Sequence, residues 1–150
     1  MSRQLIKGMT MLLLVVALAL VAVDSAYGQS NSTAKADIPF EFVAGGNSLA
    51  AGHYEFSSAT AGREVVKIRG TEQLAMMLTI SISNRTPQDK GKLVFRRYGN
   101  KYFLAEVWNA GESSGRQLVK SKEERAVQRE LASIQSKTRA ERIEIALVSR

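Results

Sequence analysis

His53 is the only histidine of the chain, so acid–base or metal chemistry would most plainly involve it. A zinc site usually takes three or four ligands from cysteine, histidine and carboxylates, and this chain has no cysteine. A serine triad could use His53 with Asp37 or Asp89, but no G-x-S-x-G motif presents a nucleophile. His53 also falls on the outward side of a predicted strand. We therefore predict no catalytic residue, no metal ligand and no enzyme activity.

Two other groups of residues have structural explanations. Glu123 and Glu124 fall in the first turn of a predicted helix, where free N–H groups and the helix dipole favour negative charge. Gly45 and Gly46 lack the strand–loop–helix setting of a phosphate loop, so they are interpreted as turn residues, as is Gly52. The sequence thus predicts no cofactor.

The segment KLVFRRYGNKYF, residues 92–103, combines basic and aromatic side chains as single-strand nucleic-acid surfaces do. It fits no RNP pattern, however, and its tyrosines and phenylalanines are equally expected in strands that fill a core. Nucleic-acid binding is therefore disfavoured. The net charge of +7 would attract anionic envelope components to an exported protein, but the charge is spread along the chain with no single basic patch, so the sequence does not identify a partner.

The first 28 residues have the pattern of a secretory signal peptide. Two basic residues precede an uncharged apolar run over 9–23, and small residues precede a cleavage site between Gly28 and Gln29. Cleavage would remove two basic residues and one acidic residue, lowering the net charge from +7 to +6. The run is shorter than the roughly 20 residues of a membrane-spanning helix. We expect an exported protein, periplasmic or extracellular, with no membrane span after cleavage; the alternative is an anchor through uncleaved residues 9–23.

The absence of cysteine limits how an exported chain can be stabilised. Export permits disulfides, so a chain without cysteine is neither a disulfide-rich scaffold nor a thiol enzyme. Residues 29–36 are small and polar and predict a disordered lead. The remaining 37–150 predict a single β-rich domain stabilised by packing.

Apolar residues alternate with others from Asp37 to Ala110, which is the period of half-buried strands. Ile38, Phe40 and Phe42 share one face, and Pro39 places this strand at an edge or at its own start. Further inward-facing residues are expected around a bend at Gly52, namely Leu49, Tyr54 and Phe56.

The next strands form two predicted hairpins. A strand over residues 63–69 is followed by a turn at Gly70–Thr71 and by a second strand with the clearest alternation in the chain. We expect one face of this second strand to enter the core, namely Met76, Leu78, Ile80 and Ile82. The second hairpin turns at Gly99–Asn100. Its second arm, 102–108, is apolar on both faces, which predicts a central or covered strand.

A helix over about 122–136 follows. Ser121 and Glu124 fit a capping box, and Val127, Leu131 and Ile134 form a narrow apolar stripe. A last strand is predicted over about 142–148. The fold class is therefore mainly β: an antiparallel β-sandwich or small barrel of about 6–8 strands, one C-terminal helix and a final strand.

The segments IPFEFVAGGNSLAAGHYEF, LVFRRYGNKYFLAEVW and KSKEERAVQRELA resemble a group of small exported bacterial β-proteins of acidobacterial type. That group carries an F-x-F-x-V-G segment, an L-x-A-G-x-Y turn and an F-x-R-Y-G hairpin; the resemblance implies the domain and no activity. The turn is also similar to one in transthyretin-like and collagen-binding-B-like β-sandwiches. That second resemblance implies structural roles for Leu49, Gly52 and Tyr54.

Three functions follow from these expectations. The first is a non-enzymatic envelope or secreted β-domain that acts by binding or structural association, with a filled core and no ionisable cluster around His53. The second is a lipocalin-like carrier of a small apolar ligand, which would need a cavity of several hundred Å³. Its lining would be Phe40, Phe56, Met76, Leu78 and Phe103. The third, a hydrolase, would need a pocket at His53 or a glutamate pair.

Overall fold

The alternating apolar residues form strands in this computed structural model, which describes residues 33–59, 62, 64–134 and 140–149. The described residues belong to one compact unit, Ser32–Arg150. The elements are β1 (Ala34–Ile38), β2 (Phe42–Ala44), β3 (Asn47–Leu49), β4 (Gly52–Ser58), β5 (Val65–Arg69), β6 (Leu74–Ser83), β7 (Lys92–Tyr98), β8 (Lys101–Trp108), β9 (Ser114–Leu118), α2 (Lys122–Ile134), β10 (Glu141–Ala146) and β11 (Val148–Ser149).

The segment expected to be a signal peptide, 1–28, lies outside the described residues, as do its apolar run 9–23 and the expected cleavage site between Gly28 and Gln29. Within the described part of the chain, no helix has the length and apolar character needed to cross a membrane.

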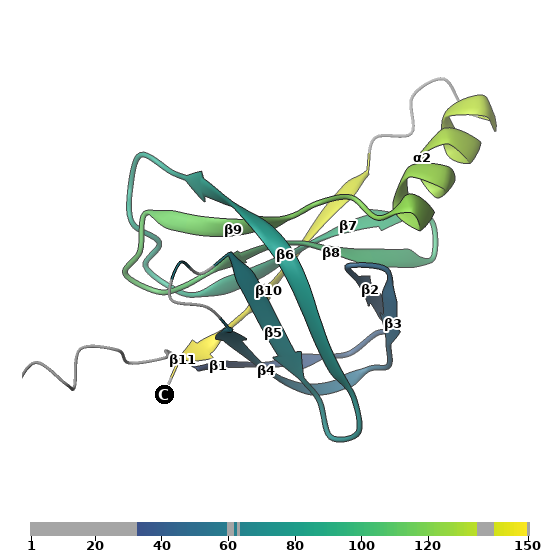
Figure 1. Cartoon of the computed structure of the whole chain (residues 1–150). Helices are drawn as coiled ribbons and strands as arrows, with labels where there is room; N and C mark the ends of the chain where they lie inside the picture. The colour runs from purple at the N-terminus through teal and green to yellow at the C-terminus, as the bar shows by residue number, and fades with distance from the viewer. Residues whose placement is uncertain (1–32, 60–61, 63, 135–139, 150) are drawn as a thin grey trace, which may run out of the picture. The chain divides into compact units, whose positions relative to one another are not determined.

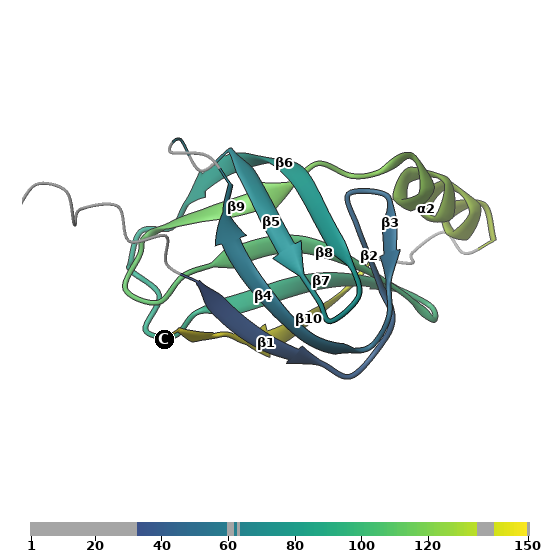
Figure 2. The same cartoon turned by 60° about the horizontal axis from the view of Figure 1, so that its bottom comes forward.

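The strands form a sheet that closes on itself, in the order β10-β7-β8-β9-β6-β5-β4-β1-β11. Leu147 alone separates β10 from β11, so one C-terminal segment pairs with β7 on one side and with β1 on the other. Strand β6 makes the opposite corner, because its first half pairs with β5 and its second half with β9. The resulting two layers of crossing strands are visible in Figures 1 and 2. This confirms the predicted class, a mainly β fold with one helix before a C-terminal strand.

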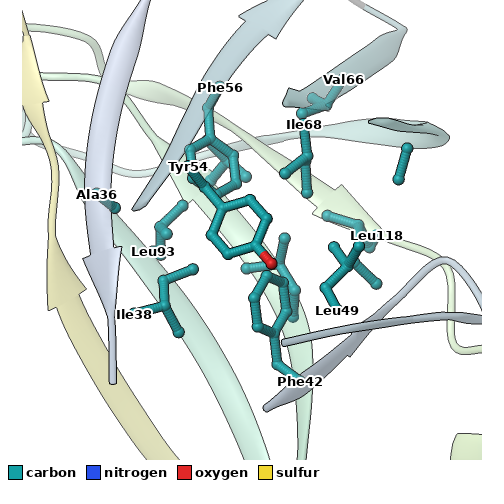
Figure 3. Packing of buried hydrophobic residues seen from close by; sticks show 14 of the residues in the cluster. Ala36, Ile38, Phe42, Leu49, Tyr54, Phe56, Val66, Ile68, Leu93 and Leu118 are labelled. Atoms are coloured by element: carbon teal, nitrogen blue, oxygen red, sulfur yellow. The ribbon is translucent and has the colours of Figure 1, made fainter. Parts of the chain in front are cut away.

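Aromatic and aliphatic side chains from both layers fill the space between them (Figure 3). Phe42 contacts Tyr54 and Phe95 edge to face, with ring centroids 5.3 Å and 5.5 Å away. The Tyr54 hydroxyl is satisfied by donating to the carbonyl of Ala50 at 2.7 Å. Leu49 is also buried, so the residues expected around the Gly52 bend point inward as predicted.

A second, smaller core holds α2 against the β7–β8 hairpin. Val43, Tyr98 and Phe103 form it, and Val127 and Leu131 of the helix pack on them. Val43 faces this core while its neighbours Phe42 and Ala44 face the main one, so β2 lies between the two. The covered outer side of β8 explains why its sequence is apolar on both faces.

Helix α2 begins as the capping signal predicts. The Ser121 hydroxyl accepts the backbone N–H of Glu124 at 3.0 Å, satisfying one of the free donors of the first turn. The helix is described to Ile134, and the rest of the predicted range, 135–136, lies outside the described residues. Ile134 is exposed, so only part of the predicted apolar stripe is buried.

The predicted inward face of β6 is wrong. Ala75, Met77 and Thr79 are buried, whereas Met76 and Leu78 are more than half exposed. Apolar residues occupy both faces of this strand, so alternation alone could not decide which face enters the core. In the folded chain Ala75 and Met77 pack in the main core, and Gly45 of the β2–β3 turn lies against the Met77 side chain. A Cβ at Gly45 would lie 3.1 Å from that side chain, and φ there is +59°.

Three boundaries also differ from the predictions. The expected disordered lead, 29–36, overlaps β1, because Ala34 and Ala36 are buried and pair with β4 and β11. Strand β1 pairs with β4 on one side and with β11 on the other, so it is not an edge strand. It ends before Pro39, which leaves Phe40 outside it. The β5–β6 turn is longer than Gly70–Thr71, since the Gly70 N–H bonds to Gln73 O.

Candidate binding surface

The outer face of β6 carries an uninterrupted row of exposed apolar side chains. Leu74, Met76, Leu78 and Ile80, here called the β6 stripe, are each between 53% and 72% exposed. Strand β6 contains no charged residue in its ten positions. Soluble monomers rarely leave large apolar side chains contiguous in water, and where they do the patch commonly marks a binding site.

Two cations lie beside the β6 stripe on the neighbouring strand. Lys67 is directly opposite Met76, and Arg69 is directly opposite Leu74. Residues opposite each other on paired strands share a face, so both cations flank the stripe. Among the described residues, neither cation forms a hydrogen bond or an ion pair. The stripe thus has an apolar centre and a basic margin.

An open groove of about 670 Å³ crosses the outer face of β1 and β4. His53 Nδ1 lies 3.4 Å from Asp37 Oδ1, and Lys35 Nζ lies 3.1 Å from Glu55 Oε1. These four residues and Arg69 line the groove, so ionisable groups do gather around His53, contrary to the expectation.

This ionisable group has the geometry of surface ion pairs. The side chains of His53 and Asp37 are 85% and 72% exposed, so water competes for every hydrogen bond between them. No described serine or threonine is hydrogen-bonded to His53, as a nucleophile would be. Among the residues that the structure describes, no three histidine or carboxylate side chains come together as metal ligands would.

Glu124 has a role that sequence reasoning missed. It is 2% exposed, and it accepts hydrogen bonds from Arg96 through Nε at 2.5 Å and Nη2 at 3.2 Å. The Tyr98 hydroxyl donates to the same carboxylate at 3.2 Å. One glutamate therefore fixes the start of α2 on β7. Its spacing from Ser121 and its place in the first turn of the helix marked it in the sequence, and both indicated a role at the start of the helix and not a buried ion pair.

The other cations of the basic aromatic hairpin also bind glutamates of this chain. Arg97 Nη1 lies 3.3 Å from Glu141 Oε2, and Lys101 Nζ lies 3.0 Å from Glu123 Oε1. The Arg97 guanidinium also lies 5.5 Å from the centre of the Tyr102 ring. The basic residues that suggested phosphate binding thus hold the helix and β10.

Burial and neighbouring charges shift the pKa of two groups in this region. Burial raises the pKa of Tyr98, and the adjacent Glu124 carboxylate adds to the rise more than Arg96 offsets it. Partial burial would raise the pKa of Glu144, but hydrogen bonds from Arg142 and Lys92 outweigh it and lower that pKa.

The five residues predicted to line a ligand cavity do not come together. Phe56 lies in the main core, and Phe103 lies in the second core under α2. Phe40 packs against Tyr102, with ring centroids 3.9 Å apart. Met76 and Leu78 lie on the exposed face of β6, because β6 turns its other face inward.

Comparison of the chain with protein-family models, curated proteins and solved structures finds no match to any of them. The fold and this surface are therefore the basis for proposing a function.

Proposed function

We propose that this chain is an exported, non-enzymatic β-domain that acts by binding through the outer face of β5 and β6. The β6 stripe carries this proposal. Exposing four large apolar side chains in a row is unfavourable by about 25 cal/mol for each Å² left in water, and binding would remove that penalty. Export is supported by the signal pattern of residues 1–28, with the periplasm or the exterior as destination.

The paired charges and the core support a binding role over catalysis or transport. Glutamates of α2 and β10 hold the hairpin cations, while Lys67 and Arg69 remain available to anionic envelope components. The lipocalin-like carrier is less favoured. The groove of several hundred Å³ is open to solvent, and ionisable side chains line it together with apolar ones, whereas a carrier would enclose its apolar ligand in the interior.

The test is site-specific photo-crosslinking in cells that produce the full chain. A photoreactive amino acid replaces Leu78 in one variant and Ile134 in a matched control. The two residues are similarly exposed, at 72% and 69%, but Ile134 lies on α2, away from the β6 stripe. We expect a discrete crosslinked product from the Leu78 position and not from the control. Equal products at both positions, or none at either, would contradict the proposal.

A further inference from the structure

The β6 stripe is widened by apolar side chains on both sides of β6. Val65 of β5 lies opposite Leu78 and is partly buried. On the other side, β9 pairs with β6 as far as Leu118, which lies opposite Thr79, so the same register places Val119 opposite Leu78. Val119 is 59% exposed, and residues opposite each other on paired segments share a face. The outer face therefore carries an apolar patch that is widest at Leu78.

This patch projects from the surface beside the groove over β1 and β4. Arg69 lines the groove, and Leu74 lies directly opposite Arg69 on β6, but no residue of the β6 stripe belongs to the groove lining. Protein partners usually bind through side chains that fill pockets. A bilayer surface instead receives apolar side chains that stand out from the protein.

The charged side chains beside the patch on β5 are cations. Lys67 lies opposite Met76 and Arg69 lies opposite Leu74, and within the described part of the chain neither cation forms an ion pair. Strand β6 itself contains no charged residue. The face formed by β5 and β6 thus combines apolar side chains with cations that are free to bind an anion.

The carboxylates of this region lie away from the patch. Glu55 lies opposite Arg69 on β4, but its side chain binds Lys35 Nζ at 3.1 Å. Glu64 precedes β5, and Glu72 lies in the turn between β5 and β6. Strands β5 and β6 therefore present no carboxylate that would repel an anionic surface.

An apolar patch beside free cations matches the surface of an anionic bilayer. Apolar side chains of a peripheral protein enter the boundary between the headgroups and the acyl chains, while neighbouring lysines and arginines bind the lipid phosphates. A second copy of the chain fits this face less well, because it would bring further cations to the same interface and no carboxylate to neutralise them.

From these features we infer that the outer face of β5 and β6 docks on a bilayer that contains anionic phospholipids, with Leu78 at the centre of the inserted patch. This inference rests on the proposed binding function and names its partner.

Vesicle flotation tests the inference with the chain starting at Gln29. The compact unit Ser32–Arg150 contains both cores, and this chain lacks the apolar run 9–23, which would bind lipid by itself. The vesicles are phosphatidylcholine, alone or with about 25% phosphatidylglycerol. At low salt, the affinity for the anionic vesicles should exceed that for the neutral ones at least about tenfold, and added salt should reduce the difference.

Substitutions in the patch are compared with a position on α2. Leu78→Glu places a negative charge in the inserted patch and should weaken binding to the anionic vesicles at least about tenfold. Ile134→Glu makes the same change at a residue of similar exposure, 69% against 72%, and should weaken binding less than about threefold. Circular dichroism verifies that each variant is folded.

The contribution of the cations is tested at constant net charge. Replacing both Lys67 and Arg69 by glutamine should weaken binding at least about tenfold. Replacing both Arg125 and Arg129 of α2 by glutamine removes the same charge from exposed side chains and should weaken binding less than about threefold.

Tryptophan fluorescence shows which side chain enters the lipid. Leu78→Trp should be quenched by phospholipids that carry bromine on their acyl chains, whereas Ile134→Trp should not. The native Trp108 is 6% exposed, so it contributes the same background to both variants.

A folded chain that does not float with anionic vesicles, or equal effects within each pair of variants, would overturn the lipid surface as partner. A dimer in sedimentation velocity that Leu78→Glu dissociates would overturn it as well, because the face would then belong to a second copy. If the vesicles fail to bind but Leu78 crosslinks to a protein in cells, the proposed binding function stands and the lipid inference falls. If Leu78 enters the vesicles but no crosslinked product of protein or lipid forms in cells, the proposed binding function fails while the affinity for lipid is retained.

Discussion

Replacing Glu124 by alanine should detach α2 from the sheet at a large loss of stability. The carboxylate is 2% exposed and accepts three hydrogen bonds, two of them from Arg96. Its removal leaves a guanidinium whose side chain is only 16% exposed, together with the buried Tyr98 hydroxyl. Removing one partner of a buried ion pair costs about 3–5 kcal/mol. Since Arg96 can partly reach water, we expect a value near the lower end.

The adjacent Glu123 supplies a matched control. It pairs with Lys101, and the two side chains are 45% and 55% exposed, so their ion pair contributes about 0–1 kcal/mol. Both substitutions remove one negative charge from the first turn of α2, so their effects on the helix dipole cancel in the comparison. Glu124→Ala should therefore exceed Glu123→Ala by about 2 kcal/mol or more.

The assay is urea unfolding followed by the fluorescence of Trp108 and by far-ultraviolet circular dichroism. Trp108 is the only tryptophan and is 6% exposed, so it reports loss of the main fold, while circular dichroism reports loss of the helix. A double-mutant cycle with Arg96→Met should show coupling, because the cation that Glu124 neutralises is then absent. Equal losses for the two glutamate variants, or additivity in the cycle, would refute the reasoning.

Three further predictions concern the strand faces and the buried rings. Met77→Ala should lower the free energy of unfolding by about 2–5 kcal/mol, because Met77 is buried. Met76→Ala should change the free energy of unfolding by less than about 0.5 kcal/mol, because Met76 is exposed; urea titrations of the two variants would measure both values. Folding raises the pKa of Tyr98, so the stability contributed by its protonated hydroxyl is complete below the ordinary tyrosine pKa and is lost as the pH rises through the elevated pKa. Phenylalanine has no group to ionise, so the melting temperature of Tyr98→Phe should fall less between about pH 9 and pH 11 than that of the unsubstituted chain. Gly115→Ala would place a Cβ 2.6 Å from the Trp108 ring, so it should destabilise by about 1–3 kcal/mol and shift the tryptophan emission; an unchanged spectrum and midpoint would contradict this packing.

Local patterns in the sequence predicted most of the elements, because those elements follow local physical rules. Alternation placed β5, the Gly99–Asn100 turn between two apolar runs placed the β7–β8 hairpin, and Ser121 placed the start of α2. Strand β9 was missed. Gly115 provides no side chain there, since the Trp108 ring occupies that space, so the strand lacks the apolar alternation that would mark it.

The candidate surface could not be predicted, because it depends on contacts between distant segments. Met76 and Met77 are neighbours in sequence with the same side chain, yet one is 57% exposed and the other 5%. Met77 is buried because it packs in the main core, where its neighbours include Gly45, more than thirty residues away in the sequence. The extent of the β6–β9 pairing likewise depends on distant segments, because the chain leaves β9 at Leu118 and begins α2 at Lys122.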